Sequence, residues 1–180
     1  ADYGELTIPL IGKYQLSNVA TVLKVIDVLT EQGWHIPSEN VRDGLSKTRW
    51  PGSFEVISRD PVFVVDGAHN PHGITATASS LNTVFEDEKL IYIFGVMADK
   101  DYDVMLDTNL PMAEELIAVT PDNPRALEAG ELASIVNNKG VKAAAASSIG
   151  EAIEMALKKA GGLKKPVVAL GSLYMIGDIK

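Results

Sequence analysis

The spacing of apolar residues changes near residue 50. In the stretch NVATVLKVIDVLTEQG, which begins at Asn18, apolar side chains recur at helical intervals, and Gly33 is a natural helix stop. The stretch PSENVRDGLSK predicts a second, short helix, and RWPG at 49–52 then breaks the pattern as a hinge between two bodies. We therefore expect a short helical piece of one domain over residues 1–48 and a second domain over residues 49–180.

Strand-like and helix-like segments alternate after this hinge. FEVISR and PVFVVD predict a strand hairpin that turns at Arg59-Asp60-Pro61. Helical patterns fill the intervals of about 25 residues between the later strands, as crossover helices between parallel strands do; these strand candidates begin near Pro61, Leu90, Glu115, Val141 and Pro166. The pattern predicts an α/β fold, an open and mostly parallel sheet with helices on both faces.

Composition narrows the class of protein. Hydrophobic residues make up 46% and charged residues 22% of the chain, as in ordinary globular domains. No apolar run approaches the roughly 20 residues of a membrane span, and a net charge of −8 argues against a nucleic-acid surface. The absence of cysteine excludes disulfides and thiolate metal sites and fits a reducing compartment. We expect a cytoplasmic protein with neither a membrane nor a nucleic-acid partner.

Polar residues follow four of the five parallel-strand candidates. Ligands bind beyond the carboxyl ends of the strands in open parallel sheets, so these four ends together predict a site. The fifth candidate, VKAAAA, is followed only by Ser147 and Ser148, which suit helix caps. The four segments are DGAHNP at 66–71, GVMADKD at 95–101, TPDNPRA at 120–126 and GSLY at 171–174.

The first of these segments allows two interpretations. Asn70 and Pro71 suit the cap and first position of a helix, whose N-terminus favours an anion such as phosphate or carboxylate. Asp66 could receive a cationic or hydroxyl partner, and His69 could donate a hydrogen bond to a negative oxygen. Equally, Asp66 could satisfy backbone groups of the turn, with His69 covering it.

The remaining polar residues are also open to two interpretations. Lys100, between Asp99 and Asp101, could meet a phosphate, although the residues alone favour pairing with these neighbours. Arg125 reads as a surface charge, and Ser172 suits a helix cap as well as a ligand contact. No His or carboxylate pair has metal-ligand spacing with a third ligand nearby, so we predict no metal site on this chain.

The chain carries no G-x-x-x-x-G-K-[ST] phosphate loop, because GKYQ at Gly12 lacks both the earlier glycine and the Ser/Thr. It also begins with Ala1 rather than Met. We therefore expect a fragment of a longer protein.

Six segments in order resemble the C-terminal part of the folylpolyglutamate synthase family, including its bifunctional dihydrofolate synthase form, within the Mur ligase superfamily. The segments are LIGKYQLSN at 10–18, RWPG, DGAHNP, GVMADKD, NPRA at 123–126 and GSLY. The resemblance implies that residues 1–48 are the tail of a P-loop ATPase domain with its hinge. It also implies that residues 49–180 form a Rossmann-like C-terminal domain.

The resemblance implies an ATP-dependent ligase. A folate or dihydrofolate carboxylate would be phosphorylated to an acyl phosphate, which the amine of L-glutamate then attacks. The missing N-terminal ATPase domain would hold most of the Mg²⁺ ligands, so this chain would be inactive alone. The implied roles are catalysis for Asp66 and His69, ATP binding for Asn18, Asp66 and Lys100, and glutamate binding for His69, Ser172 and Tyr174.

One position departs from the family pattern. Relatives usually read PGR after the hinge, with an arginine that contacts ATP phosphates, whereas this chain has Ser53 there. Serine cannot supply a fixed cationic fork. Two other functions also stay open. One is a Mur-type ligase domain that acts on a peptidoglycan precursor, against which GSLY and DGAHNP argue. The other is a non-catalytic module that binds an anionic metabolite.

Overall fold

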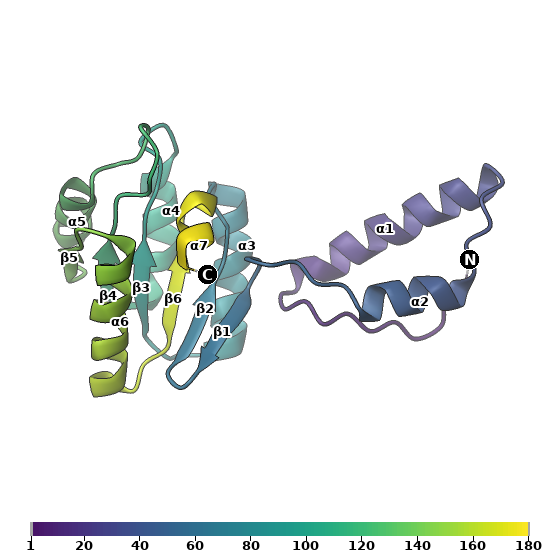
Figure 1. The fold of residues 1–180 in the computed structure, drawn as a ribbon, viewed down its shortest axis with the longest axis horizontal. Helices are drawn as coiled ribbons and strands as arrows, with labels where there is room; N and C mark the ends of the chain where they lie inside the picture. Colours follow the sequence, from purple (N-terminus) through teal and green to yellow (C-terminus); the bar gives the residue numbers. More distant parts are fainter. Residues whose placement is uncertain (1, 180) are drawn as a thin grey trace. The chain divides into compact units, whose positions relative to one another are not determined.

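The computed structural model describes residues 2–179, and the chain forms two compact units (Figure 1). The first unit extends to Pro51 and the second begins at Gly52, so the division falls within the RWPG segment. No helix of the described chain is long and apolar enough to cross a membrane.

Two helices make up most of the first unit. α1 (Tyr14–Glu31) and α2 (Ser38–Ser46) enclose a small apolar core around Tyr3, Val41 and Leu45. The Tyr3 hydroxyl donates a hydrogen bond to Asp27 on α1 at 2.8 Å. α1 ends two residues before Gly33, which has a positive φ of 95°. Both predicted helices are therefore present.

The second unit contains a six-stranded sheet in the order β1-β2-β6-β3-β4-β5 (Figure 1). β1 and β2 form the predicted antiparallel hairpin, and all the other neighbouring strands are parallel. The fold prediction is thus confirmed. The strands are β1 (Glu55–Arg59), β2 (Val62–Val65), β3 (Leu90–Phe94), β4 (Ala113–Ala118), β5 (Ala143–Ala145) and β6 (Val167–Leu170).

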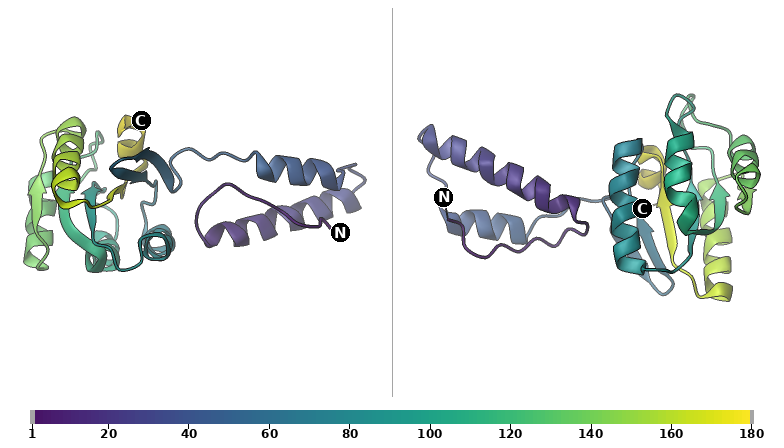
Figure 2. Two further views of the ribbon diagram at one scale, coloured as in Figure 1. Left: turned by 90° about the horizontal axis from the view of Figure 1, so that it is seen from below. Right: turned by 180° about the vertical axis from the view of Figure 1, so that it is seen from behind.

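Helices cover both faces of this sheet (Figure 2). α3 (Pro71–Phe85), α4 (Tyr102–Asn109) and α5 (Ala129–Asn138) pack on the face that carries Tyr92 and Phe94, and a 3₁₀ turn (Leu110–Met112) follows α4. α6 (Ile149–Leu163) and α7 (Leu173–Ile179) pack on the face that carries Ile91 and Ile93. Side chains of a strand alternate between faces, so β3 contributes to both cores.

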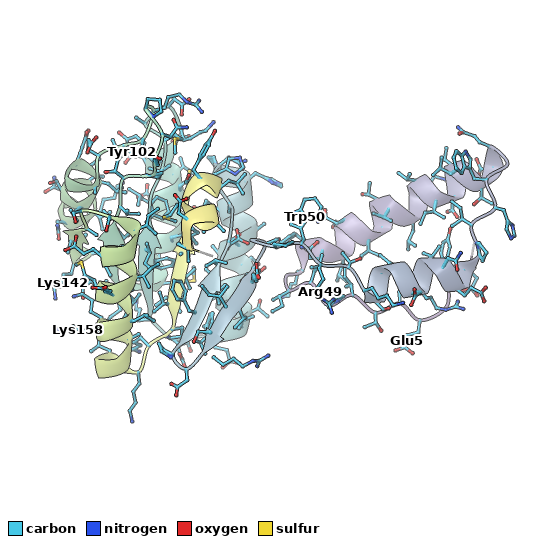
Figure 3. The ribbon with its side chains drawn as sticks, in the orientation of Figure 1. Glu5, Arg49, Trp50, Tyr102, Lys142 and Lys158 are labelled. Atoms are coloured by element: carbon cyan, nitrogen blue, oxygen red, sulfur yellow. The ribbon has the colours of Figure 1, made fainter. Side chains whose placement is uncertain are left out.

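The order of the strands predicts a crevice at the carboxyl ends of the central strands. α6 returns the chain so that β6 lies between β2 and β3. The helices after β2 and β3 lie on one face, whereas α7, after β6, lies on the other. Such a reversal places the ligand crevice of an open α/β sheet at the carboxyl ends of these strands. Tyr102 marks this edge in Figure 3, and Lys142 and Lys158 lie toward the opposite end.

Candidate functional site

The turn from β2 into α3 is held by its own polar groups. The Asn70 side chain accepts a hydrogen bond from the Gly73 amide at 2.9 Å and caps α3, whose first residue is Pro71. Both residues therefore have the cap roles that the sequence predicts. The predicted cap of α6 is also present, because Ser148 Oγ accepts from the Glu151 amide at 3.1 Å.

The carboxylate of Asp66 lies inside the protein and accepts three hydrogen bonds. Its Oδ2 accepts from the Phe54 amide at 2.7 Å. Its Oδ1 accepts from the Ala68 amide at 2.9 Å and from the Thr77 hydroxyl at 2.8 Å. Only 4% of Asp66 is exposed. The carboxylate thus accepts hydrogen bonds from backbone amides at the turn, as in the interpretation that gives Asp66 a structural role. Thr77 was not singled out from the sequence, where its position within a helix gives no signal.

A pocket of about 430 Å³ lies at the carboxyl edge of the sheet. Segments after β2, β3, β4 and β6 contribute to its wall, so the four strand ends marked by polar residues do meet at one site. The described residues that follow β5 take no part in it. The lining residues are His69, Met97, Lys100, Arg125, Gly171, Ser172, Leu173 and Tyr174.

The cationic residues of the pocket differ in their partners. Arg125 Nη1 lies 2.8 Å from Asp99 Oδ2 and pairs with it. Lys100 forms no ion pair within residues 2–179, so the interpretation that it pairs with its neighbours is wrong. Asp99 pairs with Arg125 because the loops after β3 and β4 are hydrogen-bonded to each other. The Ala98 amide donates to the Arg125 carbonyl at 2.7 Å. Lys100 is thus left to line the pocket.

Ser172 contributes a buried hydroxyl to the pocket wall. Only 2% of the residue is exposed, and Oγ finds no hydrogen-bond partner in the described chain. The alternative that this side chain caps α7 is therefore wrong. A buried hydroxyl without a partner is costly, so Ser172 Oγ is an exception that the hydrogen bonds of the described chain do not explain. Tyr174 lies beside it and is 53% exposed.

Glycines bring the walls of the pocket close together. Gly171 has a φ of 110°, and a Cβ atom there would lie 2.5 Å from the Gly95 carbonyl oxygen. Its amide donates to the Ala68 carbonyl at 2.9 Å, which ties β6 to the turn that carries His69. A Cβ atom on Gly67 would collide with the Leu173 side chain. Leu173 is exposed and the end of its side chain is flexible, so it would have to move aside, and neither this contact nor the backbone φ of Gly67 by itself requires glycine.

His69 is oriented by the backbone of its own turn. Its Nδ1 lies 2.8 Å from the Gly67 carbonyl oxygen. A carbonyl oxygen can only accept, so Nδ1 carries a hydrogen and the other ring nitrogen, Nε2, is free for a partner outside the turn.

Asn18 and Ser53 do not line this pocket. Asn18 is exposed on α1 in the first unit, where its amide donates to Gln15 Oε1 at 2.9 Å. Ser53 is half-buried just after the start of the second unit. Within residues 2–179, no three His, Asp or Glu side chains gather closely enough to hold a metal ion.

All the lining residues of the pocket except Tyr174 fall within a match to a known family. Residues 53–173 match the family model described as Mur ligase, glutamate ligase domain. The chain is 34% identical over 179 residues to folylpolyglutamate synthase of Lacticaseibacillus casei, covering 98% of this chain and 40% of that protein. It is 30% identical over 181 residues to dihydrofolate synthase/folylpolyglutamate synthase of Bacillus subtilis, covering 99% of this chain and 41% of that protein.

A solved structure has the same fold. Folylpolyglutamate synthase of Mycobacterium tuberculosis, complexed with ADP and AMPPCP, superposes with a TM-score of 0.88 at 26% identity, covering 98% of this chain and 41% of that one. The chain thus spans about two fifths of the length of these proteins. These comparisons agree with the resemblance carried by the six sequence segments.

Proposed function

The chain belongs to the Mur ligase family, whose glutamate ligase domain it carries, and on this premise we propose that it is the C-terminal domain of an ATP-dependent ligase that joins L-glutamate to a folate. In the proposed reaction, ATP transfers its γ-phosphoryl group to a folate carboxylate and ADP leaves. The amine of L-glutamate loses a proton and attacks the acyl carbon, an amide bond forms, and phosphate leaves. The acyl phosphate is needed because a carboxylate is a poor electrophile.

The observation that carries this proposal is the pocket in which a buried hydroxyl without a partner lies among cationic side chains. L-Glutamate offers two carboxylates and one ammonium group. Lys100 and Arg125 provide positive charge for the carboxylates, and Ser172 Oγ provides a hydrogen bond that nothing in the described chain satisfies. We assign His69, Ser172 and Tyr174 to the binding of glutamate.

ATP and Mg²⁺ belong to the proposed reaction of the complete enzyme. Two solved relatives that support this are the M. tuberculosis structure with ADP and AMPPCP and a Yersinia pestis folylpolyglutamate synthase/dihydrofolate synthase with AMPPNP and a Mn ion. On this chain, Asn18 is the residue we assign to ATP. Lys100, for which the resemblance implies ATP binding, lines the pocket and is assigned to the glutamate carboxylates instead. The divalent metal would be held mainly outside this chain, where it would neutralise phosphate charge.

The test compares the chain alone with the complete enzyme. We expect the chain alone to bind L-glutamate without turnover and the complete enzyme to release ADP only when a folate and L-glutamate are both present. In the complete enzyme, His69→Ala should lower turnover by more than about tenfold, within the usual range for a residue that contacts the reacting groups. Ser53→Arg should lower the Kd for ATP, because arginine adds a charged fork for phosphate.

Two results would overturn the proposal. Ligation of an amino acid to a peptidoglycan precursor but not to a folate would place the enzyme in another branch of the family. Binding of an anionic metabolite without ADP release in the complete enzyme would instead support the non-catalytic module, which Ser53 favours.

A further inference from the structure

Asp66 and His69 are joined through a single peptide group. The Ala68 N–H, which donates to Asp66 Oδ1 at 2.9 Å, belongs to the same planar unit as the Gly67 carbonyl, which accepts from His69 Nδ1 at 2.8 Å. The carboxylate and the imidazole therefore hold opposite ends of one peptide plane. Hydrogen bonds in series polarise one another, so the negative charge of Asp66 strengthens the carbonyl of Gly67 as an acceptor.

The carboxylate is itself fixed by groups from two directions. The Thr77 hydroxyl, 2% exposed on α3, donates to Oδ1 at 2.8 Å. The Phe54 amide donates to Oδ2 at 2.7 Å, from a residue with a positive φ of 42°. Asp66 therefore cannot rotate to meet a ligand without leaving three donors unpaired, and it does not line the pocket.

The arrangement determines the tautomer of His69. Nδ1 must carry a hydrogen because it faces a carbonyl oxygen. A neutral imidazole has only one N–H, so Nε2 then presents a lone pair. Nε2 has no partner within residues 2–179, and His69 lines the pocket.

We propose that Asp66 and Thr77 are positioning residues that fix the His69 tautomer through the Gly67–Ala68 peptide, so that Nε2 accepts a hydrogen bond from the ammonium group of the incoming amino acid. This inference rests on the proposed function for its ligand. It assigns the ammonium group to His69 and leaves the carboxylates to Ser172, Lys100 and Arg125. It also changes the role of Asp66 from the catalytic or ATP-binding one implied by the resemblance.

The first measurement is the ¹⁵N NMR spectrum of the His69 ring in the 180-residue chain without ligand, at a pH where the ring is neutral. We expect the pattern of the Nδ1–H tautomer. Thr77→Val and Asp66→Asn should each give a mixture of both tautomers, and Thr77→Ser should restore the native pattern. Thr83→Val is the matched control, because its hydroxyl donates only to the Ser79 carbonyl on the exposed side of the same helix. A native Nε2–H tautomer, or an unchanged pattern in Thr77→Val, would overturn the inference.

The second measurement compares the binding of L-glutamate with that of glutarate, which has both carboxylates but no ammonium group. The native chain should prefer L-glutamate, and His69→Ala should abolish that preference. Thr77→Val should reduce it by at least about fivefold, the order expected for one weakened hydrogen bond, with glutarate affinity unchanged. An equal loss for both ligands would indicate a merely structural role.

The two measurements separate the two proposals. If the native chain binds neither ligand, the proposed function and the ammonium contact both fail at this pocket, while the NMR pattern still decides the positioning role of Asp66 and Thr77. If Asp66→Asn does not fold, Thr77→Val and Thr77→Ser carry the test.

Discussion

The guanidinium of Arg125 lies 2.8 Å from the carboxylate of Asp99 and so joins the loops that follow β4 and β3 at the rim of the pocket. Both side chains are about half exposed, at 56% and 47%. An exposed pair of this kind contributes little to stability, because water and salt screen it. The effect of the pair is to hold the Arg125 guanidinium at the wall of the pocket.

Arg125→Gln should therefore separate binding from stability. We expect the free energy of unfolding to change by less than about 1 kcal/mol. The affinity for L-glutamate should fall about tenfold or more, as for a lost hydrogen bond to a charged group. Titration calorimetry and urea unfolding measure the two effects. Lys47→Gln is the matched control, since it breaks a similarly exposed pair with Asp43 in the first unit; an equal loss of affinity there would contradict the assignment.

Ser172→Ala should weaken binding without weakening the fold. The hydroxyl has no partner to lose, so its removal should leave the free energy of unfolding unchanged or raise it, within about 1 kcal/mol. Affinity for L-glutamate should fall about tenfold, because the ligand loses one hydrogen bond in a buried site. Tyr92→Phe removes another buried hydroxyl without a partner, from a residue that does not line the pocket, and should leave affinity unchanged. Unaltered affinity in Ser172→Ala would remove this residue from the site.

Gly171→Ala should damage both the fold and the pocket. The new Cβ would meet the Gly95 carbonyl oxygen, and the residue would have to keep a φ of 110°. We expect a loss of on the order of 1–3 kcal/mol in the free energy of unfolding, together with loss of glutamate binding. Gly177→Ala, on α7 where a Cβ meets nothing within 4 Å, is the control. A fully stable, fully binding Gly171→Ala variant would show that the two strand ends can separate freely.

The Glu151 carboxylate should make stability depend on pH. The hydroxyl and then the amide of Ser147 donate to it and hold its pKa below the ordinary value of 4.5. A lowered folded-state pKa means that stabilisation is present above 4.5 and is lost as the pH falls through the folded value. Glu151→Gln should thus be less stable than the native chain at neutral pH, and the difference should shrink in acid.

Urea unfolding across this acidic range checks that prediction. Glu154→Gln is the control, because Glu154 is exposed on α6 and its side chain makes no hydrogen bond or ion pair in the part of the chain that the structure describes. A constant difference between native chain and Glu151→Gln at every pH would show that hydrogen bonding by the neutral amide, and not charge, matters at this helix start.

Local patterns predicted the elements and the location of the site. Apolar periodicity predicted the hairpin and the parallel strands, and Asn70 with Pro71 predicted the start of α3, because neighbouring residues alone decide these features. Polar residues after four strands predicted which segments line the pocket, because the carboxyl ends of parallel strands lie at the same end of the sheet.

The sequence could not predict partners that the fold brings together from distant segments. Asp99 lies next to Lys100 in the chain yet pairs with Arg125, because an isolated antiparallel β-bridge between Met97 and Ala126 joins the two loops. Thr77 meets Asp66 because α3 packs beside the end of β2. The burial of Ser172 likewise depends on how closely β6 approaches β3 through Gly95. These contacts between distant segments form only when the domain is folded.

The place of β6 in the sheet has a consequence for how this domain assembles. β6 is the last strand of the described chain, yet it lies between β2 and β3 and pairs with both. During synthesis, the β1–β2 hairpin and the strands β3, β4 and β5 therefore cannot belong to one continuous sheet until β6 has left the ribosome. Gly171 and Ser172 follow β6 directly, so the strand that completes the sheet also brings these two residues to the wall of the pocket. A ribosome-bound chain that stops before β6 has neither a continuous sheet nor a complete pocket.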